Sequence, residues 1–212
     1  MKAAESIVQE SAYTDFSLTL AGTPNNIHEI ANVADKVNAL FLSSRELSGK
    51  ISVVSELLKN WPVEKQIIAD AKTSDLASVI LLASLQNRSI HITSVSNKED
   101  LALIKTVKEQ HQNVTCDVNI HSMFVSVEDH PEAVCLPDEE DQQYFWNNLD
   151  AIDVFSIGVL PSQVAAFTGN KIVTGLGIKD ALPLLLTAIN QGRLTIDDVV
   201  TKLHDNPCRI FN

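Results

Sequence analysis

Short apolar runs alternate with longer amphipathic stretches along most of this chain. Apolar runs bounded by turn-forming residues are typical of buried strands, and they fall at 16–20, 39–42, 66–71, 90–95, 114–118 and 154–157. Stretches with apolar residues at helical spacing predict helices at 3–11, 26–34, 51–59, 74–86, 98–110, 178–191 and 196–203. Strands that alternate with helices in this way predict an α/β fold built on a parallel sheet.

Local signals predict where several of these helices begin and end. Thr73 or Ser74 is the expected N-cap of the helix at 74–86, because a hydroxyl can accept a hydrogen bond from a free backbone N–H. Gly192 is the expected left-handed C-cap of the helix at 178–191. The last helix should close at Asn206-Pro207, since proline does not continue a helix.

The helix expected at 178–191 carries an apolar face. It carries Leu182, Leu185, Leu186 and Ile189 at the spacing of one buried face. We therefore expect all four side chains in the core.

The alternation of strands and helices leaves two architectures open. A doubly wound open sheet and an incomplete barrel would both give this pattern. No shift in composition along the 212 residues indicates a second domain, so the chain is interpreted as one domain over residues 1–212.

Composition and charge narrow the classes of partner. The chain has 16 basic and 27 acidic residues, for a net charge of −11, which argues against nucleic acid or an anionic membrane as a partner. The acid-rich stretch at 137–141 is interpreted as a solvated loop or a helix start. Cys116, Cys135 and Cys208 lack metal-binding spacing, and Cys116 lies in an apolar run typical of the core. With no signal peptide and no apolar run long enough for a membrane, these features predict a cytoplasmic protein.

Common catalytic and phosphate-binding motifs are absent. The sequence contains no G-x-G-x-x-G, no P-loop, no H-x-H, no H-E-x-x-H and no G-x-S-x-G. His91 and His121 lie at or just after strands and could meet in space. Two histidines are fewer than the three protein ligands that a zinc site normally needs, so a structural role is favoured for both.

Four passages resemble one enzyme family in order and spacing. They are Ile90–Val95, Val114–Val118, Ala181–Ile189 and the ending from Gly192 to Phe211. These passages resemble the dihydroorotase domains of CAD-type multifunctional pyrimidine-synthesis proteins, which belong to the amidohydrolase superfamily. The resemblance implies a (β/α)₈ TIM barrel that lacks its first two strands in this chain, so 1–212 would be a partial barrel domain.

The resemblance also allows the catalytic positions to be checked one by one. An active family member binds zinc through an H-x-H on strand 1, a carboxylated lysine on strand 4 and histidines on strands 5 and 6, and an aspartate on strand 8 transfers the proton. The strand-1 motif would precede this chain. The other positions fall at Ala39, Asp70, Ser94 and Gly158. Lys72 would add a positive charge where a cation should bind. We therefore expect no catalytic residue, no metal and no cofactor, with Ala39, Asp70, Ser94 and Gly158 as vestigial pocket positions.

The resemblance implies a structural role in a larger polypeptide. The favoured hypothesis is an inactive scaffold beside active carbamoyl-phosphate synthetase and aspartate transcarbamoylase domains, forming a homo-oligomer through the parent protein. Two alternatives stay open: a small-molecule sensor that uses the vestigial pocket, and an amidohydrolase with one metal at Asp70 and His121. The chain is expected to be a segment of a longer protein, although Met1 could also be a true start.

Overall fold

A computed structural model describes residues 6–7, 9–10, 16–110, 113–129, 136–157 and 178–211. The expected helix at 3–11 and the vestigial position Gly158 lie wholly or largely outside this part of the chain. In the part that the structure describes, no helix is long and apolar enough to cross a membrane.

The six expected strands form one parallel sheet, which confirms the α/β prediction. They are β1 (Thr19–Ala21), β2 (Ala39–Ser43), β3 (Gln66–Asp70), β4 (Ile90–Ile92), β5 (Val114–Asn119) and β6 (Val154–Ser156). Their order in the sheet equals their order in the chain. A doubly wound sheet reverses its strand order at a switch point, so this sheet is not doubly wound.

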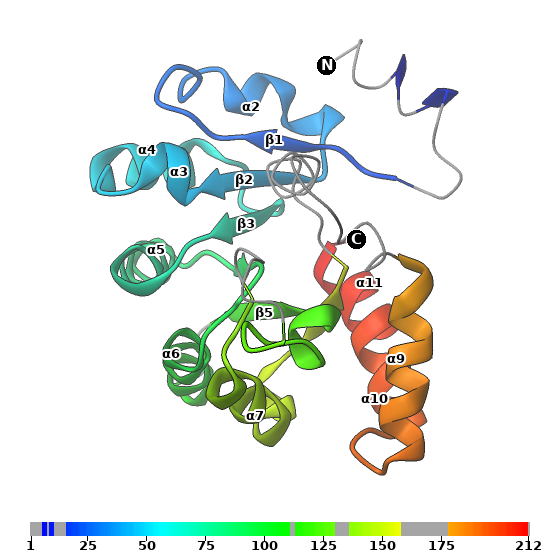
Figure 1. The fold of residues 1–212 in the computed structure, drawn as a ribbon. Helices are drawn as coiled ribbons and strands as arrows, with labels where there is room; N and C mark the ends of the chain where they lie inside the picture. The colour runs from blue at the N-terminus through cyan, green and yellow to red at the C-terminus, as the bar shows by residue number, and fades with distance from the viewer. Residues whose placement is uncertain are drawn as a thin grey trace.

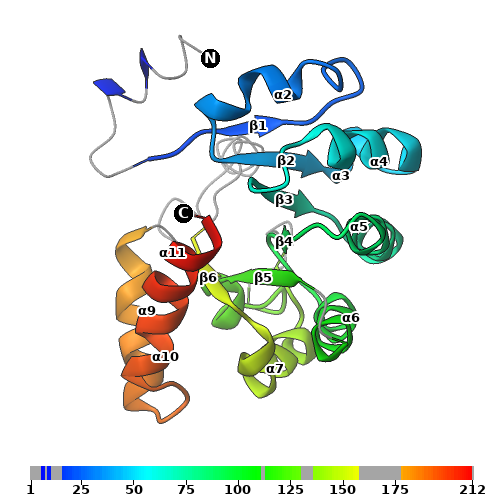
Figure 2. The same ribbon diagram turned by 180° about the vertical axis from the view of Figure 1, so that it is seen from behind.

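The helices that connect consecutive strands cover the outer side of the curved sheet (Figure 1). They are α2 (Ile30–Val33) with η1 (Ala34–Lys36), α3 (Ser44–Leu47), α4 (Ile51–Asn60), α5 (Thr73–Leu85), α6 (Lys98–Glu109), η2 (Ile120–Met123), α7 (Glu139–Asn147) and η3 (Leu149–Ala151). After β6 come α9 (Ile178–Asn190), α10 (Ile196–Val200), η4 (Thr201–Asp205) and α11 (Asn206–Phe211). Figure 2 shows these last helices together at the β6 end of the sheet.

Alternation along the strands separates an apolar outer face from a more polar inner face. Outward positions such as Leu40, Ile67, Ile92 and Cys116 are fully buried under the helices. Burial raises the pKa of the Cys116 thiol to about 12, so this cysteine is an unreactive core residue, as expected from the sequence. The inner face carries the titratable side chains discussed below.

In the C-terminal half of the chain, two predictions of helix boundaries are confirmed and one is wrong. Gly192 has a φ of +72°, and its N–H donates to the carbonyl of Ile189, which confirms the left-handed C-cap. The acidic stretch is a helix start, since the Asp138 side chain accepts a hydrogen bond from the N–H of Asp141. The helical structure does not end at Asn206-Pro207. It continues as α11, because proline is tolerated in the first turn of a helix.

The expected core face of the helix at 178–191 is also corrected in part. Leu185 is 1% exposed, as expected, and Ile189 is partly buried against the core. Leu182 and Leu186 are both 53% exposed. The buried row of α9 instead contains Ala181, Leu185 and Ala188, whose small members bring the helix close to the core.

Candidate functional site

The carboxyl ends of the parallel strands form the edge at which barrel proteins place their chemistry. Asp70 ends β3 directly opposite Ser43, and Ser94 follows β4; both Asp70 and Ser94 are half-buried. Ala39 is the first residue of β2 and pairs with Gln66, four residues before Ser43. At roughly 3.3 Å per residue, Ala39 lies about 13 Å below the edge. The structure therefore brings Asp70 and Ser94 to one edge and places Ala39 deep in the sheet.

A buried aspartate on β5 organises one half of this edge. Asp117 is 4% exposed and, besides a bond from Thr93, accepts three hydrogen bonds. The donors are Nε2 of His91 at 3.0 Å, the backbone N–H of Ser94 at 3.1 Å, and Oγ of Ser156. These donors come from β4, the segment after β4, and β6, so one carboxylate connects the strands on both sides of its own.

The ionised form of Asp117 is the one that this arrangement stabilises. Burial alone raises the pKa of a carboxyl group, but the hydrogen bonds from His91, Ser156 and Thr93 outweigh burial and hold the pKa of Asp117 below its ordinary value. Because an ionised carboxylate can only accept, Nε2 of His91 must carry a proton.

The His91 ring has no nitrogen left for a metal or a substrate. Its Nδ1 lies 2.9 Å from Oγ1 of Thr115, and its Nε2 donates to Asp117. The Phe211 ring packs against the imidazole in a T-shaped arrangement, with ring centroids 4.9 Å apart and an angle of 76° between the planes. At 1% exposure, His91 is a satisfied interior histidine, which agrees with the structural role favoured from the sequence.

The backbone of Ser94 is held in an unusual conformation. Its φ is +60°, in the left-handed region, which costs a residue with a Cβ roughly 1–2 kcal/mol. The bond from its N–H to Asp117 and the neighbouring bond from the N–H of Val95 to the carbonyl of Asp117 hold this turn in place. The vestigial position Ser94 is thus fixed by β5 through its backbone.

The other half of the edge, around β3, is arranged differently. Lys72 donates a 2.9 Å hydrogen bond to Oγ of Ser96, so its ammonium group links the segment after β3 to the segment after β4. A small cavity of about 40 Å³ opens between the edge and helices α4 and α5, and Ser43, Asp70 and Asp75 are among its lining residues. This space is large enough for a few water molecules.

The expected cap of α5 is wrong. The residue before the helix is Lys72, and neither Thr73 nor Ser74 caps it through its hydroxyl. The N–H of Thr73 donates instead to Oδ1 of Asp100 at 2.8 Å, and Asp100 is 3% exposed. A carboxylate from the next helix in the chain therefore replaces the local cap, which no local sequence signal could predict.

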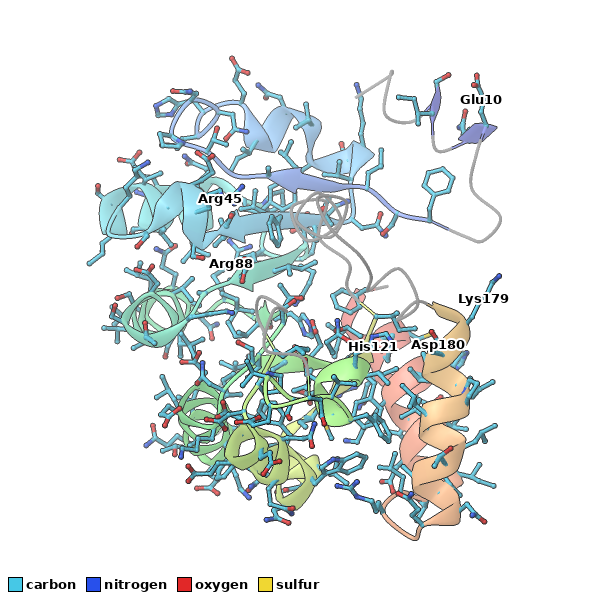
Figure 3. All side chains as sticks on the ribbon, viewed as in Figure 1. Glu10, Arg45, Arg88, His121, Lys179 and Asp180 are labelled. Atoms are coloured by element: carbon cyan, nitrogen blue, oxygen red, sulfur yellow. The ribbon has the colours of Figure 1, made fainter. Side chains whose placement is uncertain are left out.

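His121 differs from His91 in having an unused nitrogen. The amide oxygen of Asn119 lies 3.1 Å from Nδ1 of His121 and can only accept a hydrogen bond. Nδ1 therefore carries the proton, and Nε2 carries a lone pair. Nε2 is buried without a hydrogen-bond partner among the described residues. Burial lowers the pKa of His121, while Asp180 at the start of α9 raises it (Figure 3). The imidazole is therefore held in its neutral form.

The donor set does not fit a zinc centre. Among the residues that the structure describes, no three histidine, cysteine, aspartate or glutamate side chains are grouped so that they could hold a metal ion. His91 and Asp117 use their polar atoms on each other and on β4 to β6, and they do not pair with His121. Asp117, Thr115 and Ser156 were missed by the sequence analysis. The signal that could have revealed Asp117 is a carboxylate at an inward position of a largely apolar strand.

The chain is similar along almost its whole length to two multifunctional fungal proteins. The multifunctional protein URA2 of Saccharomyces cerevisiae is 64% identical over all 212 residues, and pyrABCN of Emericella nidulans is 45% identical over 97% of the chain. These matches cover 10% and 9% of the relatives, so the chain spans about a tenth of their length. No family model matches the chain.

A solved structure gives the deciding likeness. The inactive dihydroorotase-like domain of the CAD-like multifunctional protein from Chaetomium thermophilum is 46% identical, with a TM-score of 0.92 over 99% of this chain and 63% of that chain. This chain is therefore similar to an inactive dihydroorotase-like domain along almost its whole length. The L-hydantoinase of Arthrobacter aurescens, at 19% identity and a TM-score of 0.74, shares the fold of this dihydroorotase-like chain.

Proposed function

We propose that this chain is a catalytically inactive dihydroorotase-like module with a structural role in a multifunctional pyrimidine-synthesis protein. The observation that carries the proposal is the closed network around Asp117. The polar atoms of His91 and Asp117 are bonded to one another and to neighbouring protein groups. Ala39 and Ser94 cannot supply the carbamate and the imidazole that the family chemistry requires.

The proposed architecture is a (β/α)₈ barrel to which this chain contributes six strands. The unreversed strand order and the fold shared with hydantoinases support it. Within the described residues, β1 and β6 each pair with one strand only. Further strands could therefore pair with either of these two outer strands. The missing strands would come from the preceding part of the parent polypeptide, of which residues 1–212 form one partial domain.

The proposed partners are the carbamoyl-phosphate synthetase and aspartate transcarbamoylase domains of the same cytoplasmic polypeptide, assembled as a homo-oligomer. Similarity along the whole chain to multifunctional relatives ten times its length supports this placement. The sensor alternative is not favoured, because the relative of known structure is named as an inactive domain and the described edge cavity is small.

Metal analysis and turnover test the proposal. The purified protein should contain far less than one zinc per chain and should not interconvert carbamoyl aspartate and dihydroorotate. A Ser94→His variant should stay inactive, because a binuclear site works as a unit and one restored ligand leaves the others missing. Stoichiometric zinc with measurable ring closure in the wild-type protein would contradict the proposal. Activity in Ser94→His alone would show that the catalytic positions are assigned to the wrong residues.

A further inference from the structure

The exposed side of the last helical segment carries a thiol, an imidazole and a carboxylate in contact. Cys208 lies in α11 and is exposed to solvent. Its Sγ lies 3.9 Å from Nε2 of His204, and Nδ1 of His204 lies 2.9 Å from Oδ1 of Asp205. None of these three side chains takes part in the hydrogen bonds around Asp117 described above. They form a second polar cluster, which the proposed structural role does not use.

The contacts in this cluster fix where the imidazole holds its proton. A carboxylate only accepts a hydrogen bond, so Nδ1 of His204 carries the proton and Nε2 carries the lone pair. That lone pair faces the thiol of Cys208. A nucleophile, a base within reach of it and a third group that orients the base form the arrangement that activates a cysteine. The cluster contains all three members, whereas an isolated surface cysteine has only the first.

The backbone beneath the cluster is anchored to the core. Lys202 in η4 is 7% exposed, and its Nζ donates to the carbonyls of Leu149 and Ile152. The side-chain amide of Asn206 donates to the carbonyl of Asp153 at 2.8 Å. These anchors lie on both sides of the imidazole along the chain. The imidazole and the thiol therefore meet at the cost of their own side-chain freedom only, because the backbone is already fixed.

We propose that Cys208 is a site of reversible modification by low-molecular-weight disulfides of the glutathione type. His204 is the base that activates the thiol, and Asp205 is a positioning residue that orients the imidazole. The exposure of Cys208 leaves its sulfur open to a reagent from solvent. This proposal goes beyond the structural role and does not depend on it.

The reaction is a thiol–disulfide exchange. The thiol proton of Cys208 passes to Nε2 of His204 as Sγ attacks one sulfur of the disulfide. A new S–S bond joins Cys208 to that half of the reagent. The S–S bond of the reagent breaks, and its electron pair leaves on the other sulfur, which takes the proton back from Nε2. The disulfide is the oxidant, and each modified chain releases one thiol.

Cys116 is a matched control within the same chain. It is 0% exposed, its Sγ donates to the carbonyl of Ala151 at 3.3 Å, and burial raises the pKa of its thiol to about 12. It should react only when the chain unfolds. Cys135 lies outside the part of the chain that the structure describes, so Cys135→Ser serves as the background for every variant. One exposed and one buried thiol then remain.

The first measurement locates the adduct. The folded 212-residue chain with Cys135→Ser is incubated with glutathione disulfide, and the intact protein is analysed by mass spectrometry. We expect one glutathionyl group per chain, located on Cys208 by peptide mapping and removed by dithiothreitol. Cys208→Ser should abolish the adduct. Circular dichroism checks that each variant is folded.

The second measurement is the rate constant of exchange with glutathione disulfide. His204→Gln should lower it at least about fivefold near pH 7, because an unassisted thiol is only a few per cent thiolate there. The difference should narrow toward about pH 9, where the thiolate forms without a base. Asp205→Asn should lower the rate less, since the amide oxygen still accepts a hydrogen bond. His28→Gln, at another exposed histidine, should leave the rate unchanged.

Four outcomes would overturn the inference. They are no adduct on Cys208, an adduct on Cys116 in the folded chain, equal rates with and without His204 near neutral pH, or the same loss in His204→Gln at neutral and alkaline pH. The last outcome would show that the imidazole supports the local structure without acting as a base. Zinc content and turnover of dihydroorotate do not depend on Cys208, so this inference can fail while the proposed inactivity stands.

Discussion

The two halves of the carboxyl edge differ in how their polar side chains are arranged. On the β4 to β6 side, Asp117 is buried and bonded to His91, Ser94 and Ser156, so the interior is filled by side chains that satisfy one another. On the β2 to β3 side, Asp70 is half-buried and lines a small cavity, and Lys72 donates a hydrogen bond to Ser96 after the next strand. One half of this edge is therefore part of the core, while the other half stays partly open to solvent.

The largest expected effect is on the filled half. Asp117→Ala should lower the free energy of unfolding by about 3–5 kcal/mol, because it leaves buried donors of His91 and Ser156 unpaired. Chemical denaturation measures this directly. Asp117→Asn keeps the shape and serves as the control, with a smaller loss expected. A loss below about 1 kcal/mol for Asp117→Ala would mean that the network does not stabilise the fold and that the two halves are alike.

The second largest effect is expected from the loss of an apolar core contact on α9. Leu185→Ala should cost about 2–5 kcal/mol, since the side chain is 1% exposed and its removal leaves a cavity. Leu186→Ala on the same helix should change stability by less than about 1 kcal/mol in this chain, because Leu186 is 53% exposed. In the multifunctional polypeptide proposed above, Leu185→Ala should also reduce aspartate transcarbamoylase output. Equal losses for the two variants would contradict the observed orientation of α9.

The pH dependence of stability should come from the filled half. The pKa of His121 is lowered by burial in the folded protein, so the unfolded chain binds more protons once the pH falls below about 6.5. Stability should therefore decrease as the pH falls through that value. The pKa of Asp117 is also lowered, so its contribution is present above about pH 4 and is lost below it.

Denaturation at a series of pH values tests this dependence. His121→Gln should flatten the slope between pH 7 and 5 and leave the loss below pH 4 unchanged. Asp117→Asn should do the reverse. If stability is constant from pH 7 to 5 in the wild-type protein, His121 is not held in its neutral form by burial.

The smallest effect is expected on the open half. Asp70→Ala should change the free energy of unfolding by no more than about 0.5 kcal/mol, because the side chain is half-buried and no metal depends on it. Pathway flux in the parent polypeptide should be unchanged as well. A variant that stays folded but has crippled flux would show that this half of the edge has a function and that a purely structural role is wrong.

The sequence by itself determined the order and nature of most elements. Apolar runs and helical periodicity predict each of the six strands, and the left-handed stop at Gly192 follows from local backbone preferences. That Ala39 and Ser94 offer neither an amine nor an imidazole is likewise a property of residue type.

Only the tertiary structure decided which side chains meet. The hydrogen bonds from His91 and Ser156 to Asp117 join residues 26 and 39 positions apart, and no local pattern reports contacts at that separation. Asp100 replaced the expected cap of α5 for the same reason. Helical spacing gave four leucine and isoleucine positions on α9, but the placement of neighbouring elements decided that Leu182 and Leu186 remain exposed. A period shows that a helix has an apolar face, while the width of the buried part depends on what packs against it.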